Sequence, residues 1–190
     1  KNEEALRLTL RKLAESLCQP LSFTRLCNMI KAVGVSCSTS TIIEYLNHFT
    51  DSCLIFSVQN FASRFVEKAT TKKFYFVDNG LLNLFLLNNQ SALLENICAI
   101  EMKKRYGTRL YYYLHNIEVD FYVPEENLAI QVSYKLADEN TIKRETDALL
   151  KLHKLHPLNK AIIITKDEEK TITKNDLNIE FIPVWKWLLQ

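Results

Sequence analysis

Apolar residues recur at helical spacing in three short stretches near the start of the chain. Leucines spaced by three or four positions predict an amphipathic helix over residues 4–17. Ser22 is a suitable N-cap for a second helix over residues 23–32, and Gly34 follows its end. A cluster of serines and threonines then leads into a third helix over residues 39–49. Three short helices with tight connections favour a helix-turn-helix.

Two runs typical of β-strands follow these helices, at residues 54–58 and 74–77. The stretch between them is polar and basic, and the turn residues of 78–80 come directly after the second run. Three helices followed by a strand, a basic loop and a returning strand have the layout of a winged helix. We therefore expect a winged helix-turn-helix domain over residues 1–80.

The second half has a different pattern, which predicts a mixed sheet with a helix on each side. A short, fully apolar run at residues 161–165 is typical of a strand buried on both faces. The predicted elements are a helix over 91–106 ended by Gly107, strands over 109–115, 117–123 and 128–134 with a turn at 124–127, a helix over 139–155, strands over 161–165 and 179–184, and a last helical turn over 184–189. The expected fold class is α+β, with a second domain over residues 81–190.

The composition excludes several classes of protein and site. Of the 190 residues, 47% are hydrophobic and the formal net charge is +2, which excludes a disordered tail and does not by itself indicate a nucleic-acid binder. The chain has only 3 glycines, scattered along its length, so it lacks the clustered glycines of a phosphate-binding loop. Its 5 cysteines are odd in number and form no C-x-x-C pair, so we expect reduced, mostly buried thiols rather than a zinc site or a disulfide framework.

The sequence gives no sign of a membrane segment or a leader peptide, and we expect a cytoplasmic protein. It begins at Lys1 rather than Met, which indicates either processing or a piece of a longer protein.

Five phrases occur in order between residues 22 and 136. Through them the chain resembles, over roughly residues 20–185, the C-terminal region that follows the ATPase module in many prokaryotic AAA-family ATPases. They are SFTRLCNMIKAVGVSCSTSTIIEYLNHFTDSCLIF, KKFYFVDNGLLNLFL, LLENICAIEMKKR, LYYYLHNIEVDFYV and LAIQVSYKL. In that family the second half resembles the PD-(D/E)XK restriction-endonuclease fold. The resemblance implies an ATPase module upstream of Lys1, with ATP and Mg²⁺ bound there and not in this chain.

The same resemblance implies a nuclease-like site. Asp120 matches the family's strand aspartate and Glu95 its helix glutamate, while Gln131 and Ser133 stand where a carboxylate and a lysine are expected. Side chains alternate along a strand, so Lys135 is expected on the same face as Gln131 and Ser133. Mg²⁺ prefers anionic oxygen ligands, and Asp120 with Glu95 alone would hold it weakly. We therefore expect a degenerate, non-catalytic domain, with a metal-dependent nuclease using Asp120, Glu95 and the displaced Lys135 as the alternative.

The winged helix has a modest basic footprint. Its third helix contains no Lys or Arg from Thr39 to Phe49, although phosphate contacts dominate DNA affinity. The candidate nucleic-acid contacts are Thr41 and Asn47 on that helix and Arg64, Lys68, Lys72 and Lys73 in the wing. Two interpretations stay open: the domain contacts DNA, or it packs against the ATPase module and relays its state. A third class is a pure protein-interaction scaffold.

Overall fold

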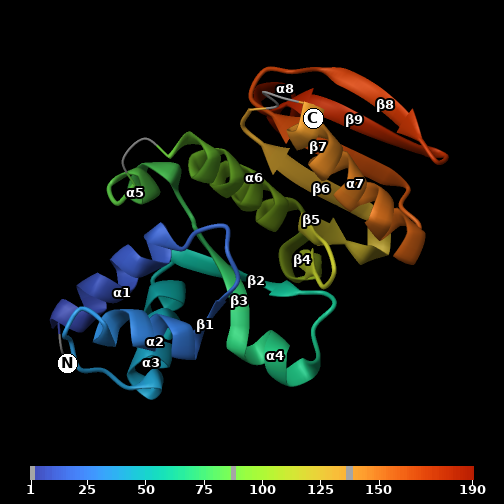
Figure 1. The fold of residues 1–190 in the computed structure, drawn as a ribbon. Coiled ribbons are helices and arrows are strands. Elements are labelled where there is room, and N and C mark those ends of the chain that lie inside the picture. The colour runs from blue at the N-terminus through green and yellow to red at the C-terminus, as the bar shows by residue number, and fades with distance from the viewer. Residues whose placement is uncertain (1–2, 87–88, 136–138) are drawn as a thin grey trace. The chain divides into compact units, whose positions relative to one another are not determined.

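The computed structural model describes residues 3–86, 89–135 and 139–190 (Figure 1). The chain divides into two compact units. The first contains the residues up to Gln59 together with Arg64–Asn89, and the second contains Asn60–Ser63 and Gln90–Gln190. Both units combine helices with strands, as the predicted α+β class requires.

The first unit holds three helices and a small antiparallel sheet. The helices are α1 (Glu3–Glu15), α2 (Phe23–Lys31) and α3 (Thr39–Asp51). The strands are β1 (Leu21–Ser22), β2 (Ile55–Asn60) and β3 (Thr71–Phe76), and β3 pairs with both β1 and β2. The predicted N-cap is confirmed, because the Ser22 hydroxyl accepts a hydrogen bond from the Arg25 backbone N–H at 3.2 Å.

Two short helices of the first unit lie where the sequence analysis expected a loop and a turn. Helix α4 (Phe65–Thr70) occupies part of the basic stretch, and helix α5 (Asn79–Asn83) begins at the predicted turn. Asp78 acts as an N-cap there, because its Oδ1 accepts a hydrogen bond from the Leu81 backbone N–H at 2.9 Å. Aspartate is favoured both in turns and at helix N-caps, so Asp78 is compatible with either structure.

Among the described residues, the second unit contains six strands of a mixed sheet, in the order β4-β5-β6-β7-β9-β8. Its elements are α6 (Gln90–Tyr106), a 3-10 turn (Gly107–Arg109), β4 (Tyr111–Leu114), β5 (Glu118–Val123), a 3-10 turn (Pro124–Glu126), β6 (Leu128–Ser133), α7 (Glu139–Leu155), β7 (Lys160–Thr165), β8 (Lys170–Lys174), β9 (Leu177–Pro183) and α8 (Val184–Leu188). Strands β6, β7 and β9 run parallel, whereas β4, β5 and β8 pair antiparallel with their neighbours.

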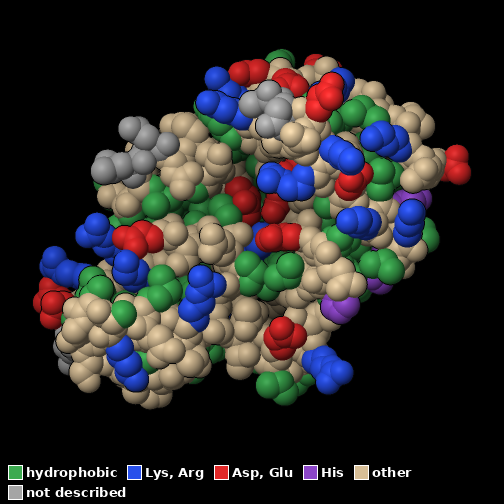
Figure 2. All heavy atoms as spheres, viewed as in Figure 1, with side chains coloured by type: hydrophobic (Ala, Val, Ile, Leu, Met, Phe, Trp, Pro, Cys, Tyr) green, Lys and Arg blue, Asp and Glu red, His purple; other side chains and the backbone are tan. Residues whose placement is uncertain are grey.

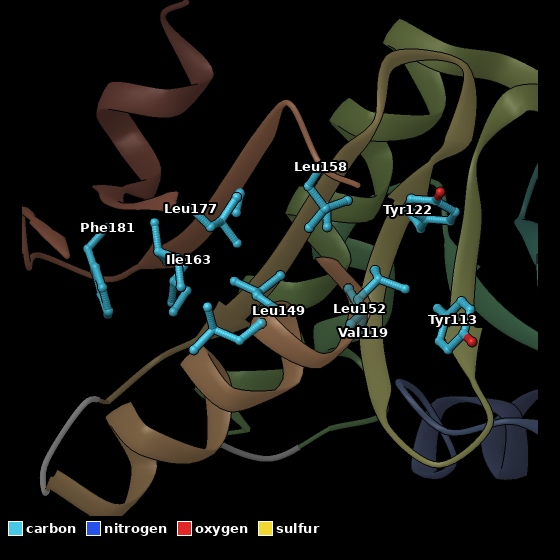
Figure 3. Close-up of a cluster of buried hydrophobic side chains, with 13 residues drawn as sticks. Tyr113, Val119, Tyr122, Leu149, Leu152, Leu158, Ile163, Leu177 and Phe181 are labelled. Carbon is cyan, nitrogen blue, oxygen red and sulfur yellow. The ribbon is translucent and has the colours of Figure 1, made fainter. Parts of the chain in front are cut away.

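One face of this sheet is covered by α7 (Figure 3). Leu149 and Leu152 of α7 are fully buried and point toward the strands that carry Ile163 and Leu177. Residues four and three apart share one side of a helix, so this spacing places an apolar stripe against the sheet. The packing fixes α7 over β6, where the candidate site lies.

Three details of the second unit differ from the sequence prediction. Strand β8 was not predicted, the 3-10 turn after Gly107 delays the start of β4, and β6 ends at Ser133. Gly107 ends α6 as expected, with a φ of +58° in the left-handed region that favours glycine.

Candidate active-site region

Strands β5 and β6 stop pairing where the candidate site residues begin. Their last ladder pair is Phe121 with Ile130, and beyond it side chains take over the hydrogen bonding. Gln131 Oε1 accepts from the Asp120 backbone N–H at 2.8 Å, and Gln131 Nε2 donates to the Glu118 carbonyl at 3.1 Å. The amide thereby supplies one donor and one acceptor, as a strand backbone does.

Asp120 of β5 in turn forms a side-chain hydrogen bond to the backbone of β6. Asp120 Oδ2 accepts a hydrogen bond from the Val132 backbone N–H at 3.0 Å. One oxygen of the aspartate is therefore engaged by backbone in this structure.

The Gln131 amide is satisfied on both of its atoms and is only 4% exposed. Besides its two bonds to β5, Nε2 donates to Glu145 Oε2 of α7 at 3.0 Å. A primary amide has two N–H donors, and both have protein acceptors here. The position where the family resemblance expects a metal-binding carboxylate holds a neutral group that is already fixed on three sides.

Glu145 is a member of this region that the sequence analysis missed. It is 7% exposed, and Arg144 donates to its Oε1 at 2.6 Å. Burial raises the pKa of the Glu145 carboxyl above its ordinary value of 4.5, and the charges of Asp120 and Glu118 add to that increase, while Arg144 opposes it. A signal existed in the sequence, since Glu145 lies four and seven positions before the buried Leu149 and Leu152.

Strand β6 does not position Lys135, the residue expected to take the place of the family's lysine. β6 ends at Ser133, so the prediction that Lys135 extends the same strand face is wrong. Ser133 is 7% exposed, and its hydroxyl donates to the Lys135 carbonyl at 3.3 Å. The Lys135 side chain itself is exposed.

Glu95 lies on α6 and is half-buried, as is Asp120 on β5. Burial raises the pKa of the buried Cys98 thiol, and the charges of Glu95 and Asp120 raise it further. Within the described residues, however, no group of three His, Cys, Asp or Glu side chains is arranged to hold a metal ion.

The candidate nucleic-acid contacts of the first unit differ in exposure. Asn47 and Arg64 are exposed, and Thr41, Lys68 and Lys72 are half-buried. Lys73 is fully buried and is not available to a phosphate in this structure. Thr41 also contributes to the start of α3, where its hydroxyl and the Ser38 hydroxyl lie 2.9 Å apart.

The comparisons with known proteins leave the function unassigned. The model of a domain of unknown function, DUF8612, matches residues 1–92. An uncharacterised protein of Methanocaldococcus jannaschii is 32% identical over the whole of this chain, which spans 45% of that relative. An uncharacterised protein of Haemophilus influenzae is 30% identical, again over the whole chain and 47% of the relative. No solved structure matches the chain significantly.

The chain thus spans about half the length of the curated relatives it matches. Among the residues that the structure describes, no helix has both the length and the apolar character needed to cross a membrane.

Proposed function

We propose that this chain is the non-catalytic C-terminal region of an AAA-family ATPase. In this proposal the first unit is a winged helix that engages a partner, and the second is a restriction-endonuclease-like domain that no longer cleaves nucleic acid. The element order of the second unit supports the proposal, because a helix, three strands, a helix and a parallel strand follow one another from α6 to β7. Three of the five matching phrases lie on α6, β4, β5 and β6, in the order expected from the family.

The proposed loss of nuclease activity rests on the neutral, buried side chain of Gln131. An active site of this type needs an anionic oxygen at that position to hold Mg²⁺. Gln131 instead offers a neutral amide that is buried and hydrogen-bonded to Asp120, Glu118 and Glu145. Serine at position 133 brings no positive charge to orient water or to offset developing charge.

Plasmid nicking tests this part of the proposal. The full chain is incubated with supercoiled plasmid and either Mg²⁺ or Mn²⁺, beside an Asp120→Ala variant purified in the same way. We expect no metal-dependent nicking above that variant. Cleavage by the wild-type chain that requires metal and disappears in Asp120→Ala would establish the nuclease alternative.

The first unit is better suited to a protein partner than to autonomous DNA binding. Helix α3 contains Glu44 and Asp51 and lacks Lys and Arg, and the wing loses one candidate cation through the burial of Lys73. On the face shown in Figure 2, Lys and Arg side chains are scattered and do not gather into one basic surface. Counterion release, the main source of DNA affinity, is correspondingly small.

Duplex binding at two salt concentrations distinguishes the partners. We expect weak binding at low salt that an Arg64→Ala, Lys68→Ala variant barely changes. Tight binding that falls steeply with salt and is lost in this variant would make DNA the partner of the first unit.

The ATPase association rests on the resemblance and on length. More than half of each curated relative lies outside the match, which leaves room for a further module. The test is ATP binding and hydrolysis by the full-length Haemophilus influenzae relative. A relative that neither binds nor hydrolyses ATP would overturn this part, whatever the outcome of the nicking assay.

A further inference from the structure

Two cysteine sulfurs touch in the first unit. The Sγ atoms of Cys27 and Cys37 lie 3.5 Å apart. Each thiol also reaches the other residue's backbone: Cys27 Sγ donates to the Cys37 carbonyl at 3.6 Å, and Cys37 Sγ donates to the Cys27 carbonyl at 3.7 Å. These contacts hold the two side chains facing one another.

The two residues have different surroundings. Cys27 lies within α2 and is 1% exposed, so a dissolved oxidant cannot reach it directly. Cys37 is half-buried and lies in the irregular segment between α2 and α3. A disulfide needs the sulfurs about 2.05 Å apart, and a residue outside a helix or strand can make that approach without breaking a backbone ladder.

We propose that Cys27 and Cys37 are a site of oxidative modification, at which hydrogen peroxide joins α2 to the segment leading into α3 by an intramolecular disulfide. The inference concerns the first unit alone and is independent of the proposed function.

The chemistry balances with peroxide as the oxidant. The Cys37 thiolate attacks one peroxide oxygen and the O–O bond breaks. The leaving hydroxide takes up the proton that the thiol had released, so the products are a sulfenic acid on Cys37 and one water. The Cys27 sulfur then attacks the Cys37 sulfur, the S–O bond breaks, and a second water leaves. Two thiols lose two electrons and two protons, and one peroxide is reduced to two waters.

Protonation sets the conditions for the first step. Burial and the neighbouring Cys27 thiol raise the pKa of the Cys37 thiol, and the nearby Lys31 ammonium lowers it. Because the thiolate is the reacting form, the reaction is best measured at mildly alkaline pH.

Peptide mapping of the peroxide-treated full chain tests the proposal. After remaining thiols are alkylated, trypsin releases residues 26–31, which carry Cys27, and residues 32–64, which carry both Cys37 and Cys53. A glutamyl endopeptidase then cuts after Glu44 and separates Cys37 from Cys53. We expect residues 26–31 linked to residues 32–44, with a mass about 2 Da below the sum of the two free peptides.

Variants sharpen the result. Cys37→Ser should abolish the linked peptide, whereas Cys53→Ser, which removes an exposed cysteine of the same unit, should leave it intact. The linked chain should also melt at a higher temperature than the reduced chain, because the cross-link restricts the unfolded state. Alkylation of both thiols after a peroxide dose that oxidises Cys53, or a sulfenic acid on Cys37 that persists without a cross-link, would overturn the proposal. The wild-type map alone decides the question if a variant fails to fold.

Discussion

At the scale of single residues, the side chain of Gln131 replaces a part of the β5–β6 ladder. Gln131→Ala removes hydrogen bonds from the Asp120 N–H, the Glu118 carbonyl and the Glu145 carboxylate. Leaving a buried polar group unpaired costs about 1–3 kcal/mol. We expect the free energy of unfolding to fall by about 2–5 kcal/mol, measured by urea denaturation.

The matched control for that variant is Gln19→Ala, at an exposed glutamine of the first unit. It should change the free energy of unfolding by less than about 0.5 kcal/mol. Equal effects of the two substitutions would show that the Gln131 amide is not a structural link between the strands.

Glu145 gives the region a pH dependence whose sign follows from its raised pKa. The folded chain keeps a proton on Glu145 above pH 4.5, where the unfolded chain has released it. Stability therefore falls as pH rises from the ordinary glutamate pKa through the raised folded value, and levels off above it. Glu145→Gln, which stays neutral, should gain stability relative to wild type across that window. Urea midpoints of both proteins from pH 4 to pH 8 check this, and parallel curves would contradict it.

The sequence predicts the role of a residue well where that role depends on neighbouring residues, and poorly where it depends on distant contacts. Ser22 as an N-cap and Gly107 as a helix end follow from hydrogen bonding and φ within a few residues, and both are confirmed. Lys135 was placed on a strand face because alternation was extended past Ser133, where β6 ends. The spacing of Glu145 from Leu149 and Leu152 indicates a buried carboxylate, but its partners lie on β6 and β5 and cannot be identified from α7 alone.

At the scale of elements, α7 offers a test of packing with a control on the same helix. Leu149 is fully buried against the sheet, whereas Leu155 is 58% exposed. Leu149→Ala should lower the free energy of unfolding by about 2–5 kcal/mol, because it leaves a cavity under the helix. Leu155→Ala should cost less than about 1 kcal/mol, since little apolar surface is lost from the core. Thermal or urea unfolding of both variants measures the difference, and similar losses would contradict the assigned face.

Elements with a strong sequence pattern were predicted well and those with a weak pattern poorly, for a physical reason. α7 and β7 carry strong periodicity or a continuous apolar run, and the observed bounds lie within a residue of the expected ones. Strand β8 alternates Thr and Ile between lysines at the edge of the sheet and buries none of its residues fully, so its pattern is weak. Asn175 and Asp176, which join β8 to β9, both have positive φ. Because Asn and Asp tolerate this conformation and paired positive φ values are typical of tight hairpins, these two residues are a better sequence signal for β8 than its own pattern.

At the scale of the whole molecule, the second unit is assembled from two separate parts of the chain. Asn60–Ser63 belongs to it, although the residues on both sides belong to the first unit. The Asn60 amide mimics a strand against β4: Nδ2 donates to the Leu114 carbonyl at 2.8 Å, and Oδ1 accepts from the Leu114 N–H at 2.9 Å. Phe61 adds edge contacts to the rings of Tyr122 and His156, at centroid distances of 5.1 and 5.6 Å.

This arrangement makes the second unit depend on a residue that precedes it by some thirty positions. Asn60 is 5% exposed, so Asn60→Ala should leave the Leu114 backbone groups poorly satisfied and destabilise the second unit by about 2–4 kcal/mol. Both tryptophans of the chain, Trp185 and Trp187, lie in α8, so tryptophan fluorescence during urea unfolding reports on that unit alone. The exposed Asn47→Ala in the first unit is the control and should leave the fluorescence transition in place. An unchanged transition in Asn60→Ala would show that the Asn60–Ser63 segment rests on the second unit without stabilising it.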